Sequence, residues 1–109
     1  MISRVLDRLF VGVGDSELTI EQLDQYNITH VINVGGFELE RKSIEKEGKR
    51  VLYWEHLSDD GENPRWKFTT ILSKLNGALS YTYSSRVLVC CRAGMSRSVF
   101  IIMKGEFRP

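Results

Sequence analysis

The chain has 109 residues, a length that fits one small domain with a single hydrophobic core. Hydrophobic residues make up 42% of the sequence and charged residues 27%, which is ordinary for a soluble globular protein, and no run of ~20 apolar residues predicts a membrane span. The 15 basic and 14 acidic side chains leave a net charge of +1, so charge gives no reason to expect binding to nucleic acid or to a membrane.

Cysteine and histidine content excludes two further classes. Cys90 and Cys91 are the only cysteines and are adjacent, so the disulfide framework of a small secreted protein is excluded. His30 and His56 are far apart, and no zinc-type spacing occurs, so we expect no metal site and place each histidine at a strand end or on the surface. Residues 1–8 lack the apolar core of a signal peptide, which favours the cytosol, with the nucleus as the alternative.

Hydrophobic patterning predicts strands and helices that alternate along the chain. Residues 8–14 form a predicted first strand that is closed by glycines. Thr19 and Gln22 have the spacing of a capping box, which predicts a short helix as far as residue 25. Residues 28–34 are rich in β-branched side chains and predict a second strand.

The middle of the chain is more charged. Residues 37–50 mix both signs and predict a solvated helix or loop. The alternative is that Arg41 and Lys42 rim a binding pocket and steer anionic substrates toward it. Residues 51–57 then predict a third strand.

After Pro64, apolar residues recur at helical spacing and predict a helix that packs on the sheet and ends between residues 81 and 85. Trp66 and the tyrosines are expected in core or boundary packing. Residues 86–90 predict a fourth strand, and residues 97–104 a last helix. The predicted fold is α/β: a single domain, residues 1–109, with a mostly parallel sheet of about four or five strands flanked by helices. Ligand chemistry is expected outside the carboxyl ends of the strands.

Residues 87–98 combine a buried strand, a short loop of small and polar residues and a helix start. Backbone N–H groups in such a loop, with a helix N-terminus behind them, can surround a phosphate-sized dianion. A thiol at Cys91 in the same field is expected to have a lowered pKa. Arg97 can hold two oxygens of the bound group through a bidentate fork, and Ser98 can donate a hydrogen bond to a departing thiolate.

The sequence Cys-Arg-Ala-Gly-Met-Ser-Arg-Ser of residues 91–98 resembles the signature loop of the cysteine-dependent protein tyrosine phosphatases, specifically the small dual-specificity class. The Leu-Phe-Val-Gly strand, the Ile-Thr-His-Val-Ile-Asn-Val strand and an acidic loop follow in the order of that family. The resemblance implies a protein tyrosine phosphatase-like fold, a phosphocysteine intermediate at Cys91, and no metal or other cofactor. It also implies a phosphate loop made of Arg92, Ala93, Gly94, Met95, Ser96 and Arg97.

Expulsion of the leaving oxygen requires a general acid. Asp59 and Asp60 lie on a predicted loop that contains Gly61 and Pro64. We favour Asp60 because the Asp-Gly-Glu-Asn-Pro sequence that it begins resembles the acid loop of some relatives. Asp59 is the alternative general acid, and either aspartate could instead cap the helix that follows.

Two features depart from the family pattern. Cys90 stands where the family has His, so Cys91 is expected to be less acidic, or Cys90 to trap an oxidised Cys91 as a disulfide. The sequence also stops soon after the loop, which predicts a domain that is incomplete at its C-terminus. Residues 99–103 would then leave an apolar patch exposed, and the domain would be marginally stable or would self-associate through that patch.

The sequence therefore predicts a protein phosphatase that hydrolyses phosphotyrosine, and in a broader version phosphoserine and phosphothreonine, on a phosphorylated protein substrate. No nucleic-acid or membrane partner is expected. Two alternatives stay open: an inactive pseudophosphatase that binds phosphate, and a phosphatase that acts on a phosphoinositide or an RNA 5′ end.

Overall fold

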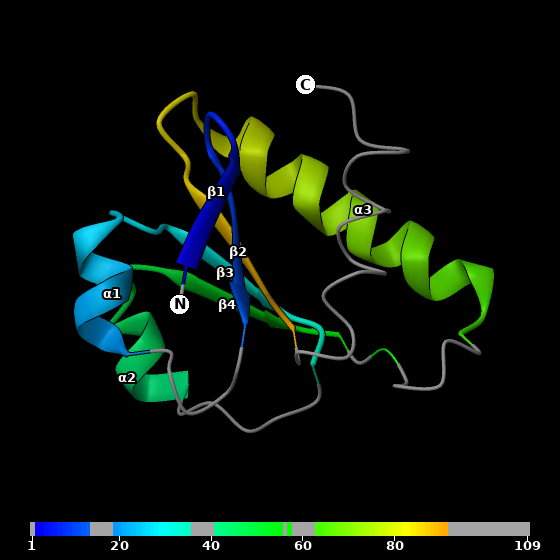
Figure 1. Ribbon diagram of the computed structural model, residues 1–109, viewed down its shortest axis with the longest axis horizontal. Helices are drawn as coiled ribbons and strands as arrows, with labels where there is room; N and C mark the ends of the chain where they lie inside the picture. Colours follow the sequence, from blue (N-terminus) through cyan, green and yellow to red (C-terminus); the bar gives the residue numbers. More distant parts are fainter. Residues whose placement is uncertain (1, 14–18, 36–40, 56, 58–62, 92–109) are drawn as a thin grey trace.

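The structure is a computed structural model that describes residues 2–13, 19–35, 41–55, 57 and 63–91. Within these ranges the chain forms five strands and three helices (Figure 1). In chain order they are β1 (Ile2–Leu6), β2 (Leu9–Val13), α1 (Ile20–Gln25), β3 (His30–Asn33), α2 (Arg41–Glu45), β4 (Val51–Trp54), α3 (Arg65–Tyr81) and β5 (Val87–Cys91).

The strands form one sheet in the order β1-β2-β5-β3-β4. β2, β5, β3 and β4 run parallel to one another, and the edge strand β1 pairs antiparallel with β2. The predicted α/β fold with a mostly parallel sheet is confirmed. β1 was not predicted, because an edge strand with one buried and two exposed side chains lacks the pattern of a buried strand.

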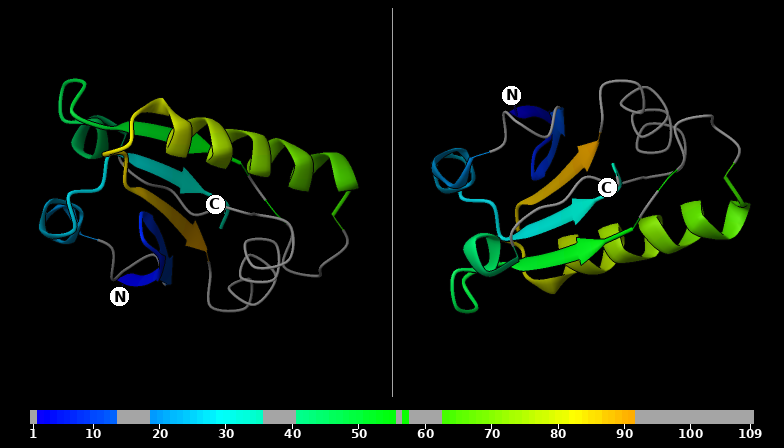
Figure 2. Two further views of the ribbon diagram at one scale, coloured as in Figure 1. Left: turned by 90° about the horizontal axis from the view of Figure 1, so that it is seen from above. Right: turned by 90° about the horizontal axis from the view of Figure 1, so that it is seen from below.

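The helices cover both faces of the sheet (Figure 2). Ile71 and Leu75 of α3 pack on one face, whereas Leu23 of α1 and Ile44 of α2 pack on the other. Every residue of β5 is buried, so its apolar sequence reflects a strand with a helix layer on each side. Among the described helices, none is long and apolar enough to cross a membrane.

The predicted short helix is confirmed as α1. Thr19 Oγ1 accepts a hydrogen bond from the Gln22 N–H at 3.2 Å, and Gln22 Oε1 accepts one from the Thr19 N–H at 3.2 Å. This reciprocal pair is the predicted capping box, and it satisfies donors that would otherwise be unpaired at the helix start.

The charged segment contains a short helix, α2, in which Lys42 is exposed, as the prediction of a solvated segment requires. α2 lies toward the edge of the sheet at which the strands begin (Figure 2). The alternative, in which Arg41 and Lys42 rim a phosphate pocket, stays untested, because the Arg41 side chain and the predicted phosphate loop lie outside the described part of the structure.

The expectation of core or boundary packing is wrong for three aromatic side chains. Trp66 is 61% exposed, Tyr81 73% and Tyr83 92%. α3 buries a stripe that includes Ile71 and Leu75, and Trp66 lies about 140° around the helix from Ile71. Tyr81 ends the helix, where its ring meets the sheet only at the edge of the His30 ring, and Tyr83 lies beyond the helix.

The end of α3 is held by an arginine from the turn between β1 and β2. Arg8 Nη1 lies within hydrogen-bond distance of three carbonyl oxygens, those of Leu79 at 3.0 Å and of Thr82 and Ser85 at 3.1 Å each. Carbonyls at a helix C-terminus carry partial negative charge and lack partners within the helix. A cation there fixes the turn that leads into β5.

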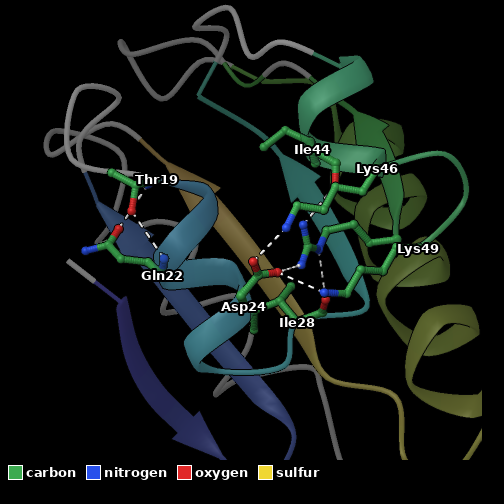
Figure 3. Close-up of polar contacts among 8 residues, drawn as sticks. Thr19, Gln22, Asp24, Ile28, Ile44, Lys46 and Lys49 are labelled. Carbon is green, nitrogen blue, oxygen red and sulfur yellow. Dashed lines mark hydrogen bonds and ion pairs between the residues drawn. The ribbon is translucent and has the colours of Figure 1, made fainter.

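A second polar cluster ties α1 to the turn before β4 (Figure 3). Asp24 accepts from Lys46 Nζ at 2.7 Å, Lys49 Nζ at 3.0 Å and Arg50 Nη2 at 2.5 Å. Arg50 is buried and also donates to the carbonyl oxygens of Ile28 and Ile44, each at 3.1 Å. Hydrogen bonds from Lys46 first, then from Arg50 and Lys49, hold the pKa of Asp24 well below its usual range.

We expect the Asp24→Asn substitution to destabilise the protein at neutral pH and to matter less in acid. Because the folded-state pKa is lowered, the stabilisation by the carboxylate is complete above its unfolded pKa of about 3.9 and is lost as pH falls further, toward the folded pKa. Urea unfolding of both proteins at pH 7 and near pH 3 measures this. Glu21→Gln, on the same helix but without an ion pair among the described residues, is the control. An equal loss of stability at both pH values would contradict this role of the carboxylate.

Candidate active site

Cys91 is the last residue of β5, the central strand. In the parallel register Val13 at the end of β2 lies beside Cys91, and Asn33 at the end of β3 lies beside Cys90. The carboxyl ends of three parallel strands therefore meet at one edge of the sheet. This edge is where ligand chemistry is expected in such a fold, and the predicted nucleophile lies on it.

The thiol of Cys91 is buried among apolar side chains that include Val11, Val34 and Leu57. Its Sγ donates a weak hydrogen bond to the Gly12 carbonyl oxygen at 3.5 Å, which a thiolate could not do. Burial raises the pKa of the Cys91 thiol to about 11. Loss of water is the cause that acts on the thiol in its described surroundings. The expectation of a lowered pKa depends on residues 92–98, which lie outside the described ranges, and it stays a prediction.

Cys90 faces the other side of the sheet, in the cluster that contains Phe10, Leu23 and Leu88. Burial, and secondarily the neighbouring Cys91, raises the pKa of the Cys90 thiol far above its ordinary value. Both cysteines are free thiols, and successive side chains of a strand point to opposite faces. A disulfide between them would require β5 to abandon its pleat, so the trapping alternative does not fit the strand.

Asn33 is a site residue that the sequence prediction missed. Its side chain is fully buried at the end of β3, and its Oδ1 accepts a hydrogen bond from the Gly35 N–H at 3.1 Å. This bond shapes the turn by which the chain leaves the sheet, at the same edge as Cys91. An Asn two residues before a glycine pair was the available signal, because Asn side chains bond to the backbone two residues on.

The remaining predicted site residues lie outside the described ranges, as do His56, the predicted last helix and the C-terminal apolar segment. These site residues are Asp59, Asp60, Arg92, Ala93, Gly94, Met95, Ser96, Arg97 and Ser98. Within the described ranges, no three His, Cys, Asp or Glu side chains are grouped so that they could hold a metal ion.

No family model matches the sequence, and a search of curated proteins finds no match. Solved structures do match. The Yvh1 phosphatase domain from Chaetomium thermophilum is 21% identical over all of this chain, with a TM-score of 0.73. Human DUSP28 is 21% identical over 95% of the chain (TM-score 0.68), and the core catalytic domain of the PP-IP phosphatase SIW14 from S. cerevisiae is 14% identical over 93% (TM-score 0.67).

These likenesses establish the fold, which is that of the dual-specificity, protein tyrosine phosphatase-like phosphatases. The chain spans 61% of the SIW14 domain, 70% of DUSP28 and 74% of the Yvh1 domain. It therefore corresponds to the larger part of each matched structure and not to the whole.

We expect alkylating reagents to modify Cys91 before Cys90 in the folded protein. Burial raises the thiol pKa of both residues, but less for Cys91, so more of its reactive thiolate is present at any pH. Iodoacetamide treatment at pH 9, followed by mass spectrometry, measures the order. Cys90→Ser should keep most of the fast labelling and Cys91→Ser should lose it; unchanged labelling of Cys91→Ser would contradict the assignment.

Proposed function

We propose that the chain is a cysteine-dependent phosphatase whose nucleophile is Cys91. The observation that carries the proposal is the position of this buried thiol at the carboxyl end of the central parallel strand. The sequence Arg-Ala-Gly-Met-Ser-Arg-Ser follows it directly. The fold shared with solved phosphatases supports the proposal independently of that motif.

The proposed reaction has two steps. The thiolate of Cys91 attacks phosphorus, the bond from phosphorus to the ester oxygen breaks, and Asp60 gives its proton to the leaving oxygen. The backbone N–H groups of residues 92–97 and the guanidinium of Arg97 hold the equatorial oxygens. Water then attacks the phosphocysteine with Asp60 as base, and Ser98 donates a hydrogen bond to the released thiolate. Asp59 is the alternative acid.

This mechanism requires Cys91 to be ionised, and the free energy needed to stabilise its thiolate can be compared with what nearby charges supply. A fall in the thiol pKa from about 11 to about 7 corresponds to ~5 kcal/mol of added stabilisation of the thiolate. A unit positive charge about 4 Å away contributes ~4 kcal/mol at an effective dielectric constant of about 20. One close guanidinium, together with inward-pointing amides, is therefore of the right size to activate the thiol. Arg97 is the residue proposed for this task.

The proposed substrate is phosphotyrosine on a phosphorylated protein, with phosphoserine and phosphothreonine in the broader version. The likeness to SIW14, a PP-IP phosphatase, supports the alternative of a non-protein phosphate substrate. A second candidate function is that of a pseudophosphatase that binds phosphate without turnover. The raised pKa of Cys91 favours this candidate, because a neutral thiol is a poor nucleophile.

Turnover of p-nitrophenyl phosphate tests the assigned roles. We expect Cys91→Ser to lose about 10³-fold or more of kcat, because the nucleophile is removed. Asp60→Asn should lose about 10²-fold with substrates that have a poor leaving group, because general acid catalysis contributes roughly that much. Cys90→Ser and Asp59→Asn are the matched controls and should stay within about threefold, since neither removes a reacting group.

The same variants, and turnover of further substrates, decide between the alternatives. Full activity of Asp60→Asn with loss in Asp59→Asn would reverse the choice of acid. Retention of a phosphotyrosine peptide without turnover would favour the pseudophosphatase. Turnover of a phosphoinositide or a 5′-phosphorylated RNA, with none of the peptide, would contradict the proposed substrate class.

Titration of the Cys91 thiol, followed by its ultraviolet absorbance in Cys90→Ser, tests the activation step. We expect the pKa to lie within about 3.5–7.5, the range of activated cysteines, and to rise toward about 11 in Arg97→Met. The pKa of Cys91 is expected to rise in this variant because the cation that favours the thiolate has been removed. Arg65→Met, on exposed α3 surface, is the control. A pKa near 11 with Arg97 intact would contradict the phosphatase mechanism and support the inactive binder.

A further inference from the structure

A cavity of about 430 Å³ lies at the edge of the sheet opposite to Cys91. Its lining includes His30 and Val51, the first residues of β3 and β4, whereas Cys91 is the last residue of β5. The volume falls within the range of sites that hold small molecules. The cavity is therefore a second candidate binding site, and its residues are not those of the proposed phosphatase mechanism.

The cavity has an excess of positive charge at one side. Lys49 and Arg50 line it, and no acidic side chain is among the described residues of its lining. Both cations pair with Asp24, which also pairs with Lys46, so three positive charges share one carboxylate (Figure 3). The Lys49 side chain is 56% exposed, and two of its three ammonium protons remain after the bond to Asp24.

Hydrogen bonding gives His30 the role of a donor toward the cavity. The Arg86 carbonyl oxygen already accepts from the backbone N–H groups of Thr29 at 2.8 Å and His30 at 3.2 Å. The Thr29 hydroxyl therefore donates its hydrogen bond to His30 Nδ1, at 2.8 Å, in preference to that oxygen, at 3.1 Å. A neutral imidazole that accepts at Nδ1 carries its proton on Nε2, which has no partner in the described chain.

Next to these donors the cavity wall is aromatic. The Tyr81 ring is 73% exposed and meets the His30 ring edge-on, with centroids 5.7 Å apart. Tyr53 is partly buried and also lines the cavity. Aromatic faces next to cationic and N–H donors fit a ligand that has a flat apolar part and an anionic end.

We propose that this cavity binds a small organic anion that carries a flat ring. The anionic group lies against Lys49 Nζ and His30 Nε2, with Arg50 behind them, and the ring lies against Tyr81. Arg50 acts as a positioning residue, because its hydrogen bonds to Asp24 and to the carbonyls of Ile28 and Ile44 hold the turn that carries Lys49. The site does not depend on Cys91.

Phenylphosphonate is a suitable probe, because it combines an anionic phosphonate group with a ring. Its phosphorus–carbon bond replaces the ester bond that the proposed phosphatase reaction breaks. We expect chemical-shift changes at the backbone amides of His30, Gly48, Lys49 and Val51, with a Kd on the order of 1 mM for so small a ligand. Methylphosphonate, which lacks the ring, should bind about threefold or more weakly. Equal affinity for both phosphonates would contradict the role of Tyr81.

A pair of lysine variants provides the matched comparison. Lys49→Gln and Lys46→Gln each remove one positive charge that pairs with Asp24, but only Lys49 lines the cavity. We expect Lys49→Gln to raise the Kd about tenfold, as loss of a charged hydrogen bond does, and Lys46→Gln to raise it less than about threefold. Equal effects would indicate general attraction to the cluster and would overturn the proposal.

Two further measurements separate this site from the catalytic edge. Amide shifts of β5 in each lysine variant check that the fold is intact. Cys91→Ser should keep the shift changes around Lys49 with an unchanged Kd, so failure of the phosphatase proposal leaves this one standing. Shift changes confined to the ends of β2, β3 and β5 would place the probe at the carboxyl edge and overturn the second site.

Discussion

The structure depends on the burial of β5 between β2 and β3. All five of its residues are buried, and it hydrogen-bonds to parallel neighbours on both sides. Because side chains alternate along it, Val89 and Cys91 contribute to the core under α3, while Leu88 and Cys90 contribute to the core under α1 and α2. One strand thus links both cores, and its position fixes where the Cys91 sulfur lies at the carboxyl edge.

The same burial disfavours the ionised form of Cys91. Removal of Cys91 from water stabilises the packed sheet but disfavours the thiolate, and the Gly12 carbonyl selects the protonated form. An enzyme built on this strand must therefore supply positive potential from the loop that follows, and the sequence places Arg92 and Arg97 there. The strand holds the proposed nucleophile in a fixed position, and the residues that follow would have to supply the positive charge that favours its thiolate.

The elements that could be predicted from the sequence are those with strong short-range sequence patterns. The buried run of β5 and the Thr19–Gln22 capping box are short-range patterns, and both elements formed as expected. β1 was missed because pairing with β2 makes it a strand, not its own composition. Trp66 was misplaced because apolarity does not show which side of a helix faces the sheet. The lowered pKa of Cys91 assumed a field from residues 92–98, whereas the described surroundings contribute burial.

The cavity at the edge where the strands begin could not be predicted from such local patterns. Lys49, His30 and Tyr81 are far apart in sequence, and no motif joins them. The turn that carries Lys49 contains three consecutive residues with positive φ, Lys46, Glu47 and Gly48, a conformation that costs roughly 1–2 kcal/mol for each non-glycine residue. The ion pairs of Asp24 and the hydrogen bonds of the buried Arg50 tie this turn to α1 and α2. A turn held in this way keeps its cations in one place, and fixed cations bind an anion with less loss of side-chain entropy than mobile ones.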